Sequence, residues 1–329
     1  MDSRLVPNNL KEYIIHRSIA TKLTNFKLEN IPNILLHGIC NNGKHTIAKL
    51  LINHLYNTNI MNQTSINTHD LKIGNNIVTI EFFSSPYHIE ITLYEYGLYD
   101  KYIISEFLHN YVKYENITGR LKLIILNHID KISKPAQYSL RGLLEQYSTQ
   151  ARYICLVNSL SQIDPAVRSR IFCIRIPRPS NTDLKTYLDY VSNNIVKLSK
   201  SKRNLLLKKK NLFELNYTIS SFIRNKKVLE LNNYDVMFKK IIKYIEEPNI
   251  ESILKIRLIC YNLLLINVNM RTLLDYLVDY YTSNKQLSDK LKLSIIEYAA
   301  EINAQMCIIE HDIICIEFFV LKVKKLFIS

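Results

Sequence analysis

The stretch NILLHGICNNGKHTIAKLLINHLYN, residues 33–57, decides the fold of this chain. It opens on a short apolar run that predicts a buried strand, and it closes on apolar residues at helical spacing. Between them stands Gly-x4-Gly-Lys, from Gly38 to Lys44. In a strand–loop–helix setting this motif predicts a phosphate cradle, because backbone N–H groups, a helix N-terminus and a lysine all present positive charge. The residues expected to contact the phosphates are Gly38, Asn41, Asn42, Gly43, Lys44, His45 and Thr46.

One position of the loop departs from the usual pattern. The residue after the lysine is ordinarily Ser or Thr, whose hydroxyl binds Mg²⁺. Here it is His45, and Thr46 comes one place too late. The context favours ATP or ADP as the ligand, whereas His45 counts against a Mg²⁺ site formed by the protein. The alternative interpretation is a strand and a helix joined by a turn that matches the motif by chance.

The composition predicts a globular, intracellular protein with a polyanionic partner. Hydrophobic residues make up 47% of the 329 positions, and no apolar run approaches the ~20 residues of a membrane-spanning helix. The N-terminus does not have the pattern of a signal peptide. The six cysteines include no C-x-x-C pair, so neither zinc nor a disulfide framework is expected. The net charge of +14 favours nucleic acid over membrane as the partner.

The first half of the chain alternates strand and helix patterns, which predicts an α/β domain with a mostly parallel sheet. After residues 33–37, strands are expected at 77–83, 121–126, 153–157 and 171–176, and helices at 99–112 and from Ser133 to about 147.

The second half begins at a hinge with Pro177 and Pro179, after which Ser180 is expected to cap a helix. The densely basic stretch 197–210 is either a surface for DNA or another anionic partner, a targeting signal, or a solvated helix face. From about residue 232 the pattern is one of long amphipathic helices without a motif of chemistry.

Asn127 and His128 stand where P-loop ATPases carry an Asp-Glu pair after a central strand. In that pair the Asp orients Mg²⁺ and the Glu polarises the attacking water. Asparagine lacks the charge, and neutral imidazole replaces a proton-accepting carboxylate poorly. The alternative interpretation of His128 is a turn residue at a strand end. These residues predict a site that binds nucleotide and does not cleave it.

Together the motifs resemble the small subunits of replication factor C, the eukaryotic and archaeal sliding-clamp loader of the AAA+ class. The resemblance rests on the P-loop, on SSPYHIEIT at 84–92, and on segments within 127–148 and 158–170. It extends more faintly to the end of the chain. Gly43-Lys44-His45-Thr46 makes the chain most similar to the small-subunit paralogue whose P-loop ends Gly-Lys-Lys-Thr and whose own ATPase centre is degenerate.

The resemblance implies an AAA+ P-loop domain with a parallel sheet at 1–177, a small helical lid at 178–235 and an all-α collar at 236–329. It implies that the chain joins other replication factor C subunits in a hetero-pentamer that loads the sliding clamp onto primer-template DNA with ATP. No membrane partner is implied. The implied location is the nucleus or an equivalent replication compartment, including that of a nucleomorph or a large DNA virus.

The resemblance also assigns roles to single residues. Arg170, in Ser169-Arg170, corresponds to an arginine finger that acts on the nucleotide of a neighbouring subunit. Asn158 corresponds to a sensor residue that faces the nucleotide. Lys101 and Lys134 open two helices whose starts face the DNA backbone in the family.

The chain departs from the family at several positions. The Ser-Arg-Cys signature ends in Ile171, and the paired arginines of the helix after Asn127 become Arg141-Gly142. The N-terminal Tyr-Arg-Pro element that touches the adenine is reduced to residues 4–7. The phosphate-sensing arginine of the lid falls on Phe213 or Glu214.

Two functions remain open from the sequence. The first is a clamp-loader subunit inside a DNA-dependent ATPase complex, inactive in its own site. The second is an autonomous P-loop NTPase, for example a helicase loader, in which His128 or a nearby acid performs the chemistry. An intact Arg170 beside the altered Asn127-His128 pair favours the first, because a subunit that gives an arginine to its neighbour needs no water-activating residue of its own.

Overall fold

The computed structural model describes residues 3–60, 63–113, 121–207, 212–223, 234–247, 249, 251–265, 268, 270–284, 287–306 and 312–328. The chain divides into two compact units, residues 1–226 and 227–329. The predicted boundaries after residues 177 and 235 stay predictions.

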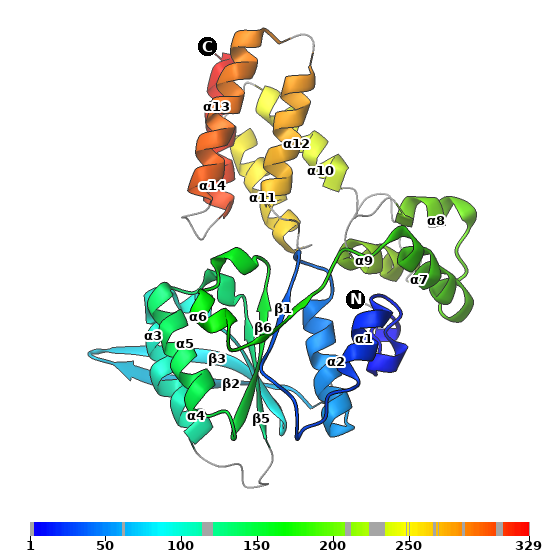
Figure 1. Ribbon diagram of the computed structural model, residues 1–329. Helices are drawn as coiled ribbons and strands as arrows, with labels where there is room; N and C mark the ends of the chain where they lie inside the picture. Colours follow the sequence, from blue (N-terminus) through cyan, green and yellow to red (C-terminus); the bar gives the residue numbers. More distant parts are fainter. Residues whose placement is uncertain are drawn as a thin grey trace. The chain divides into compact units, whose positions relative to one another are not determined.

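Unit 1 is built on a seven-stranded sheet of order β2-β3-β4-β5-β6-β1-β7 (Figure 1). Strands β4, β5, β6, β1 and β7 pair in parallel, while β2 and β3 are antiparallel to their neighbours. The predicted α/β domain with a mostly parallel sheet is confirmed. The strands are β1 Ile34–His37, β2 Ser65–Ile73, β3 Asn76–Ser84, β4 His88–Thr92, β5 Lys122–Asn127, β6 Ala151–Val157 and β7 Phe172–Arg175.

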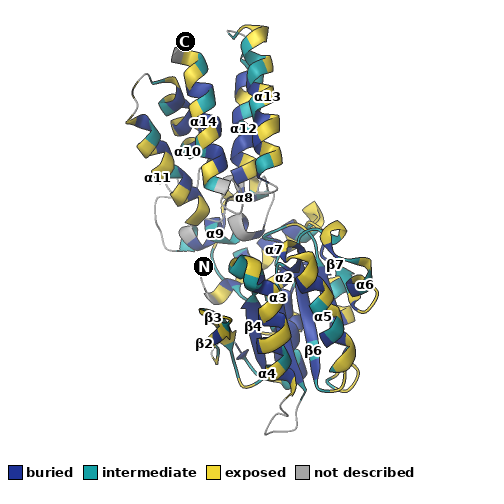
Figure 2. Ribbon diagram, turned by 90° about the vertical axis from the view of Figure 1, so that its left-hand side faces the viewer, coloured by how far each residue is buried: buried dark blue, intermediate teal, exposed yellow. Residues whose placement is uncertain are grey.

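Helices cover both faces of this sheet, so its central strands are buried on both sides (Figure 2). Leu36 and Ile125 belong to the core on the side of α2, whereas Leu35 and Ile124 belong to the core on the side of α5. This alternation follows from the pleat, which points successive side chains to opposite faces. The covering helices are α1 Arg17–Leu23 and α2 Lys44–Tyr56 on one face, with α3 Asp100–Tyr102, the π-helical segment η5 Ile103–Leu108, α4 His109–Lys113 and α5 Lys134–Gln146 on the other.

Most elements predicted for the first half are confirmed. The helix expected at 99–112 is formed by α3, η5 and α4 in succession. Ser133 caps α5 as predicted, its Oγ accepting from the backbone N–H of Ala136 at 3.3 Å. The strand expected at 77–83 is β3, but its hairpin partner β2 and the buried strand β4 were missed. Gly74 has φ of +59° at the first position of the two-residue turn between them, a conformation that favours glycine.

The segment after β7 carries the helices α7 Asn181–Asn194, α8 Lys200–Leu207 and α9 Leu212–Ile223. Ser180 caps α7 as predicted, in a capping box with Asp183. The hydroxyl of Tyr187 donates to Asn216 at 2.7 Å and so ties α7 to α9. Part of the basic stretch lies in α8, where Arg203 pairs with Asp189 at 2.7 Å, whereas Lys208, Lys209 and Lys210 lie outside the described residues.

Unit 2 is helical in all its described elements, which confirms the helical C-terminal region. Its core gathers apolar side chains from every helix, among them Phe238, Leu273, Ile302 and Phe319. Lys324 of α14 is also buried there, and its Nζ donates to the carbonyls of Tyr244 at 3.1 Å and Asn249 at 2.7 Å and to the Ser252 hydroxyl. The helices are α10 Tyr234–Glu246, α11 Ser252–Leu265, α12 Met270–Ser283, α13 Asp289–Gln305 and α14 Asp312–Ile328.

Among the described residues, no helix has the length and apolar character needed to cross a membrane. The described cysteines are free thiols, and Cys307 lies outside the described residues.

Candidate nucleotide-binding site

The loop between β1 and α2 has the backbone geometry that its sequence predicts. Gly38, Asn41 and Gly43 have φ of 153°, 62° and 84°, the region that favours glycine and tolerates asparagine. At Gly38 an added Cβ would collide with the carbonyl oxygen of Ile176, and at Gly43 it would lie 2.5 Å from the Tyr13 hydroxyl. Gly38 is therefore required by the packing as well as by the turn, whereas at Gly43 the turn favours glycine and a larger residue would have to displace the Tyr13 side chain.

Lys44 is buried at the start of α2, and its ammonium is held by three oxygens. Nζ donates to the carbonyls of Gly38 at 2.6 Å and Ile39 at 2.9 Å, and to Oδ1 of Asn158 at 2.9 Å. Burial lowers the pKa of Lys44, and the charge of nearby Asp130 acts in the opposite direction. The lysine is thus a fixed cation inside the loop, at the N-terminus of a helix.

Asn158 lies next to the loop because of the strand order. It follows β6, which is inserted between β1 and β5. Its backbone N–H donates to Oδ2 of the buried Asp130 at 2.9 Å, and Asp130 also accepts from the N–H of Ser159 at 3.1 Å. The structure brings this predicted sensor residue together with Lys44, while its role as a sensor stays a prediction.

His128 stands at a tight turn after β5, with φ of +51°. Nδ2 of Asn158 approaches His128 Nδ1 at 3.4 Å, and the Tyr94 ring lies edge-on at 5.5 Å between centroids. Burial is the main cause that lowers the pKa of His128, so its imidazole is neutral at pH 7. The ring is packed among these partners as a turn residue would be.

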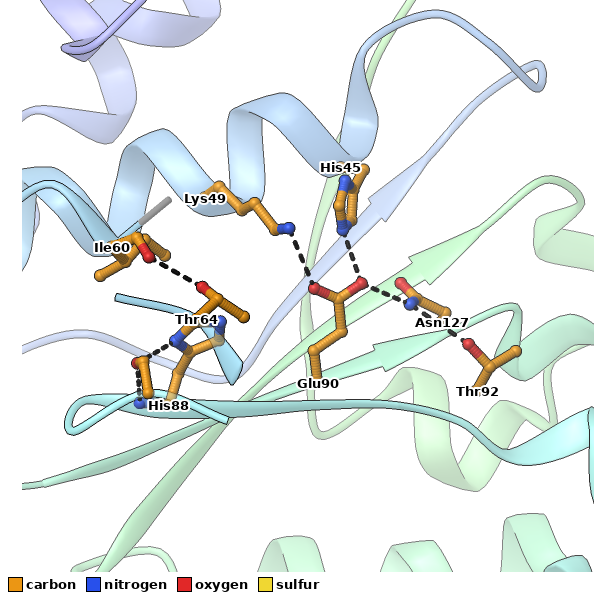
Figure 3. A network of polar contacts seen from close by, with 9 residues as sticks. His45, Lys49, Ile60, Thr64, His88, Glu90, Thr92 and Asn127 are labelled. Atoms are coloured by element: carbon orange, nitrogen blue, oxygen red, sulfur yellow. Dashed lines mark hydrogen bonds and ion pairs between the residues drawn. The ribbon is translucent and has the colours of Figure 1, made fainter. Parts of the chain in front are cut away.

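Asn127 belongs to a polar cluster centred on Glu90 of β4 (Figure 3). Oε1 of Glu90 accepts from Nδ2 of Asn127 at 2.8 Å and lies 2.6 Å from Nε2 of His45. On the other side, Lys49 Nζ lies 3.4 Å from Oε2. His45 and Lys49 are one turn apart on α2 and both point toward the carboxylate.

The electrostatics of this cluster fix the ionisation of Glu90. Burial alone would raise the pKa of its carboxyl, but the hydrogen bond and charge of His45, the charge of Lys49 and the bond from Asn127 outweigh it. Together they lower the pKa of Glu90 to about 2. An ionised carboxylate only accepts hydrogen bonds, so Nε2 of His45 carries the proton in this contact.

These residues do not fit a Mg²⁺ ion. Mg²⁺ demands oxygen ligands in near-octahedral geometry. The residue after Lys44 offers an imidazole bound to Glu90, Asn127 turns its NH₂ group to the same carboxylate, and Lys49 also faces it. Within the described ranges, no group of three or more His, Cys, Asp or Glu side chains is placed to hold a metal.

Several buried polar atoms near the loop have no hydrogen-bond partner in the part of the chain that the structure describes. Besides the carboxylate oxygens Glu90 Oε2 and Asp130 Oδ1, they are Tyr13 Oη, His16 Nε2 and Asn42 Oδ1. Tyr13 lies under Gly43, and the rings of Tyr13 and His16 are 6.4 Å apart. Burial raises the pKa of Tyr13 and lowers that of His16. Buried polar groups are seldom left unpaired, so these atoms fit contacts to a ligand in the loop. The sequence interpretation did not identify Tyr13 or His16.

Arg170 lies away from this loop. Strands β1 and β7 are parallel, with Ile34 opposite Phe172 and His37 opposite Arg175. The loop follows the end of β1 whereas Arg170 precedes the start of β7, which separates them by roughly 13 Å along the strands at ~3.3 Å per residue. The Arg170 side chain is 37% exposed, and its guanidinium pairs with Glu145 of α5 and donates to the Ala166 carbonyl at 2.6 Å.

Lys101 and Lys134 are both exposed, and a buried carboxylate joins the helix starts that carry them. Asp100 Oδ1 accepts from the N–H of Lys101 at 2.6 Å and from Oγ of Ser133 at 2.9 Å, while Oδ2 accepts from the N–H of Ser133 at 2.6 Å. The two predicted DNA-contact lysines therefore stand on neighbouring helix starts. In contrast, the side chains of Phe213 and Glu214 lie outside the described structure.

The comparisons with known proteins agree with the predicted resemblance. No family model matches the chain. The chain is 26% identical to replication factor C subunit 3 of Arabidopsis thaliana, covering 96% of this chain and 94% of the relative. It is also 26% identical to replication factor C subunit 5 of Saccharomyces cerevisiae, covering 92% and 93%. A solved structure of the Thermotoga maritima RuvB Holliday junction branch migration motor matches 85% of this chain and 81% of its own with 14% identity and a TM-score of 0.47.

Proposed function

We propose that this chain, whose relatives over most of its length are replication factor C subunits, is the small subunit of a clamp loader that binds nucleotide without hydrolysing it. In the assembled hetero-pentamer it supplies Arg170 to the nucleotide of a neighbouring subunit. The observation that carries the proposal is the contrast within one site. The phosphate loop around Lys44 is intact, while the positions that would activate water are engaged in other contacts.

Nucleotide binding is supported by the loop and by its unpaired surroundings. Lys44 and the N-terminus of α2 supply positive charge where phosphates bind. Tyr13 Oη and Asn42 Oδ1 supply a donor and an acceptor that the described residues leave without partners. We infer that ATP or ADP occupies this site, its phosphates at Lys44 and Asn158.

Weak or absent hydrolysis is supported by the surroundings of the nearby carboxylates. Glu90 faces His45, Lys49 and Asn127. Cationic and N–H groups therefore occupy the positions from which a water molecule could give a proton to the Glu90 carboxylate. Oδ2 of Asp130 accepts from two backbone N–H groups that position Asn158 and Ser159. A general base needs a group within reach of the attacking water, and His128 is already packed against Asn158 and Tyr94.

The trans role of Arg170 is supported by its distance from its own loop and by its exposure. Arginine suits this role because it stays charged and its planar fork matches phosphate oxygens. The ion pair with Glu145 holds the side chain at the surface until a stronger anion replaces it.

A partner-binding role for unit 2 is supported by α11, which carries apolar residues on two faces. One face contributes Ile256, Cys260 and Leu263 to the core. The opposite face exposes Leu254, Leu258 and Leu265, with Leu265 at 82%. A helix that is apolar beyond its own core face needs a second partner, and we infer that neighbouring subunits cover it in a collar.

The remaining partners follow from the same family. We infer that Lys101 and Lys134 contact phosphates of primer-template DNA, which is supported by the bonds of Asp100 to the two helix starts. The sliding clamp is the cargo of the complex. Because the reported relatives are eukaryotic replication proteins, we infer a nuclear or equivalent replication compartment.

The test is steady-state ATP hydrolysis by the complex reconstituted with its partner subunits, clamp and primed DNA. An arginine finger is typically worth ~10³ to 10⁵ in rate at the site it serves, so Arg170→Ala should remove the contribution of one site. Nucleotide binding by this chain should not change. Arg168→Ala is the matched control, because it is an exposed arginine two positions earlier.

Three outcomes would contradict the proposal. Wild-type hydrolysis by Arg170→Ala together with slow hydrolysis by Arg168→Ala would show that Arg168, and not Arg170, is the finger. No effect of either variant would remove the clamp-loader assignment. Robust ATPase activity of the isolated chain, abolished by His128→Ala, would favour the autonomous NTPase instead.

A further inference from the structure

We propose that the nucleotide site takes a metal-free nucleoside diphosphate or triphosphate, and that the cluster of His45, Lys49 and Glu90 stands where a P-loop would hold Mg²⁺. This inference rests on the proposed function, because it concerns the ligand of the same loop. Its basis is the arrangement of the cluster and not a missing ion.

His45 stands at the metal-binding position of the loop. In a P-loop the side chain of the residue after the lysine is the one that reaches the metal. Here that side chain is His45, and it contacts Glu90 of the neighbouring layer at 2.6 Å. Thr46 is not an equivalent replacement, because the next residue of a helix points about 100° away.

The groups around Glu90 would repel a metal ion. Lys49 follows His45 by one turn, and its Nζ lies 3.4 Å from Oε2 of Glu90. Asn127 directs its NH₂ group to Oε1. A Mg²⁺ ion near Glu90 would face a fixed ammonium and two N–H donors. It would have to displace them from a buried carboxylate, and like charges at such distances repel strongly away from bulk water.

Lys44 supplies the positive charge that a metal ion would otherwise supply to the phosphates. Lys44 remains beside the phosphate positions, and the buried carboxylate of Glu90 is already paired with Lys49 and His45 before a ligand arrives. Fixed charges of this kind need no reorganisation when an anion binds. The site therefore needs no metal ion to bind a free nucleotide. A nucleotide that carries Mg²⁺ would bring the ion toward the ammonium of Lys49, which repels it.

The experiment measures binding of ADP labelled on its ribose with an N-methylanthraniloyl group to the full-length chain. The dissociation constant is determined by fluorescence in excess EDTA and again in millimolar Mg²⁺. We expect binding in EDTA, with an affinity in Mg²⁺ that is unchanged within about twofold or weaker, because Mg²⁺ then competes for the free nucleotide. Unlabelled ADP in EDTA should raise the thermal unfolding temperature.

A pair of variants sharpens the test. His45→Thr restores a hydroxyl at the metal position and removes the imidazole, so its affinity should fall in EDTA by about tenfold and recover in Mg²⁺. His54→Thr is the control on the same helix, since Nε2 of His54 contacts the Thr24 carbonyl at 3.1 Å outside the cluster. It should behave as the wild type in both conditions.

The outcomes separate the two proposals. Binding by the wild-type chain that tightens at least tenfold with Mg²⁺ would overturn this inference and leave the proposed function standing. No binding of ADP or ATP in either condition, by a chain that unfolds cooperatively, would overturn both. The wild-type measurement alone decides between them, so the result does not depend on how the variants fold.

Discussion

Lys44 in unit 1 and Lys324 in unit 2 are both buried lysines whose ammonium groups are held by oxygens, yet their surroundings differ. Lys44 donates to two carbonyls of its own loop and to Asn158. Lys324 donates to carbonyls of Tyr244 and Asn249 and to Ser252, which closes the connection between α10 and α11 onto α14. Burial lowers the pKa of both.

The difference teaches that a buried, fully bonded lysine is not by itself a ligand site. Lys44 stands at a helix N-terminus, in a loop with residues at positive φ, beside buried polar atoms that the described residues leave unpaired. Lys324 lies in the last turns of a long helix and bonds to two main-chain carbonyls and to the hydroxyl of the buried Ser252. Of the two, the first arrangement leaves hydrogen-bonding capacity for a phosphate-bearing ligand.

The largest expected effect is on ligand affinity at Lys44. Lys44→Met should weaken ADP binding by about 100-fold, about 2.7 kcal/mol, because charge-assisted hydrogen bonds to phosphate are removed. The dissociation constant of labelled ADP measures this. Lys324→Met should bind ADP as the wild type does, and equal weakening in both variants would remove the distinction between the two lysines.

The second effect is on stability and belongs to Lys324. Lys324→Met should destabilise unit 2 by about 2 kcal/mol, since the carbonyls of Tyr244 and Asn249 and the buried hydroxyl of Ser252 lose a charged donor. Hydrogen exchange should quicken in α10 and α14 and stay unchanged in β5 and β6. The control is Lys325→Met, which replaces an exposed lysine one position later. Equally accelerated hydrogen exchange in that variant would show that the buried ammonium of Lys324 does not hold α10 to α14.

The third effect is a pH dependence confined to unit 1. Burial lowers the pKa of His88 from 6.5 to about 4, and Ser85 contacts its Nδ1 at 2.6 Å. The unfolded chain therefore binds a proton below pH 6.5 that the folded chain does not, and unit 1 should lose about 1 kcal/mol by pH 5.5. Glu90, with its pKa lowered to about 2, should add a further loss only below about pH 4.5.

Hydrogen exchange of the β4 and β5 amides between pH 7 and 5.5, corrected for the intrinsic rate, measures this loss, with the α12 amides of unit 2 as the internal reference. His88→Gln should reduce the dependence over that interval without abolishing it, because burial also lowers the pKa of His16, His37 and His128 in unit 1. A slope in His88→Gln equal to that of the wild type would show that His88 does not contribute.

The smallest effect concerns exposed lysines, which differ from both buried ones. Lys101→Ala with Lys134→Ala should lower the slope of log affinity for primed DNA against log salt by about 0.9 for each DNA phosphate that is no longer neutralised, when measured in the assembled complex. Lys113→Ala, at the other end of the same helical segment as Lys101, is the control. An unchanged slope would locate the DNA-binding charge outside these helix starts, with 197–210 as the next candidate.

The sequence predicted the features whose causes are local. The loop, the Ser133 and Ser180 caps and the central strands depend on neighbouring residues, so their patterns can be recognised. The strand β2 could have been found as well, because Gly74-Asn75 between two strand-like runs is a hairpin signal. It was missed because its side chains are mostly exposed and show little alternation of apolar and polar residues.

The candidate site was predicted only in part for a different reason. Glu90 meets His45 because β4 lies beside β5 and α2 crosses over them, which depends on strand order. Tyr13 reaches Gly43 from an N-terminal segment through tertiary packing. No spacing along the chain encodes such contacts. In the same way, the presence of a lysine at position 324 in an apolar helix does not reveal whether its ammonium faces solvent or the oxygens of Tyr244, Asn249 and Ser252.

The contact of Gly38 with the backbone of Ile176 has a consequence for how such a chain can change over generations. Any side chain at this position collides with a main-chain carbonyl, so even alanine would displace the segment that leads into α7. Purifying selection would therefore keep Gly38 even in a descendant that had ceased to bind any ligand. Retention of this glycine in a homologue would then be no evidence that the homologue still binds one.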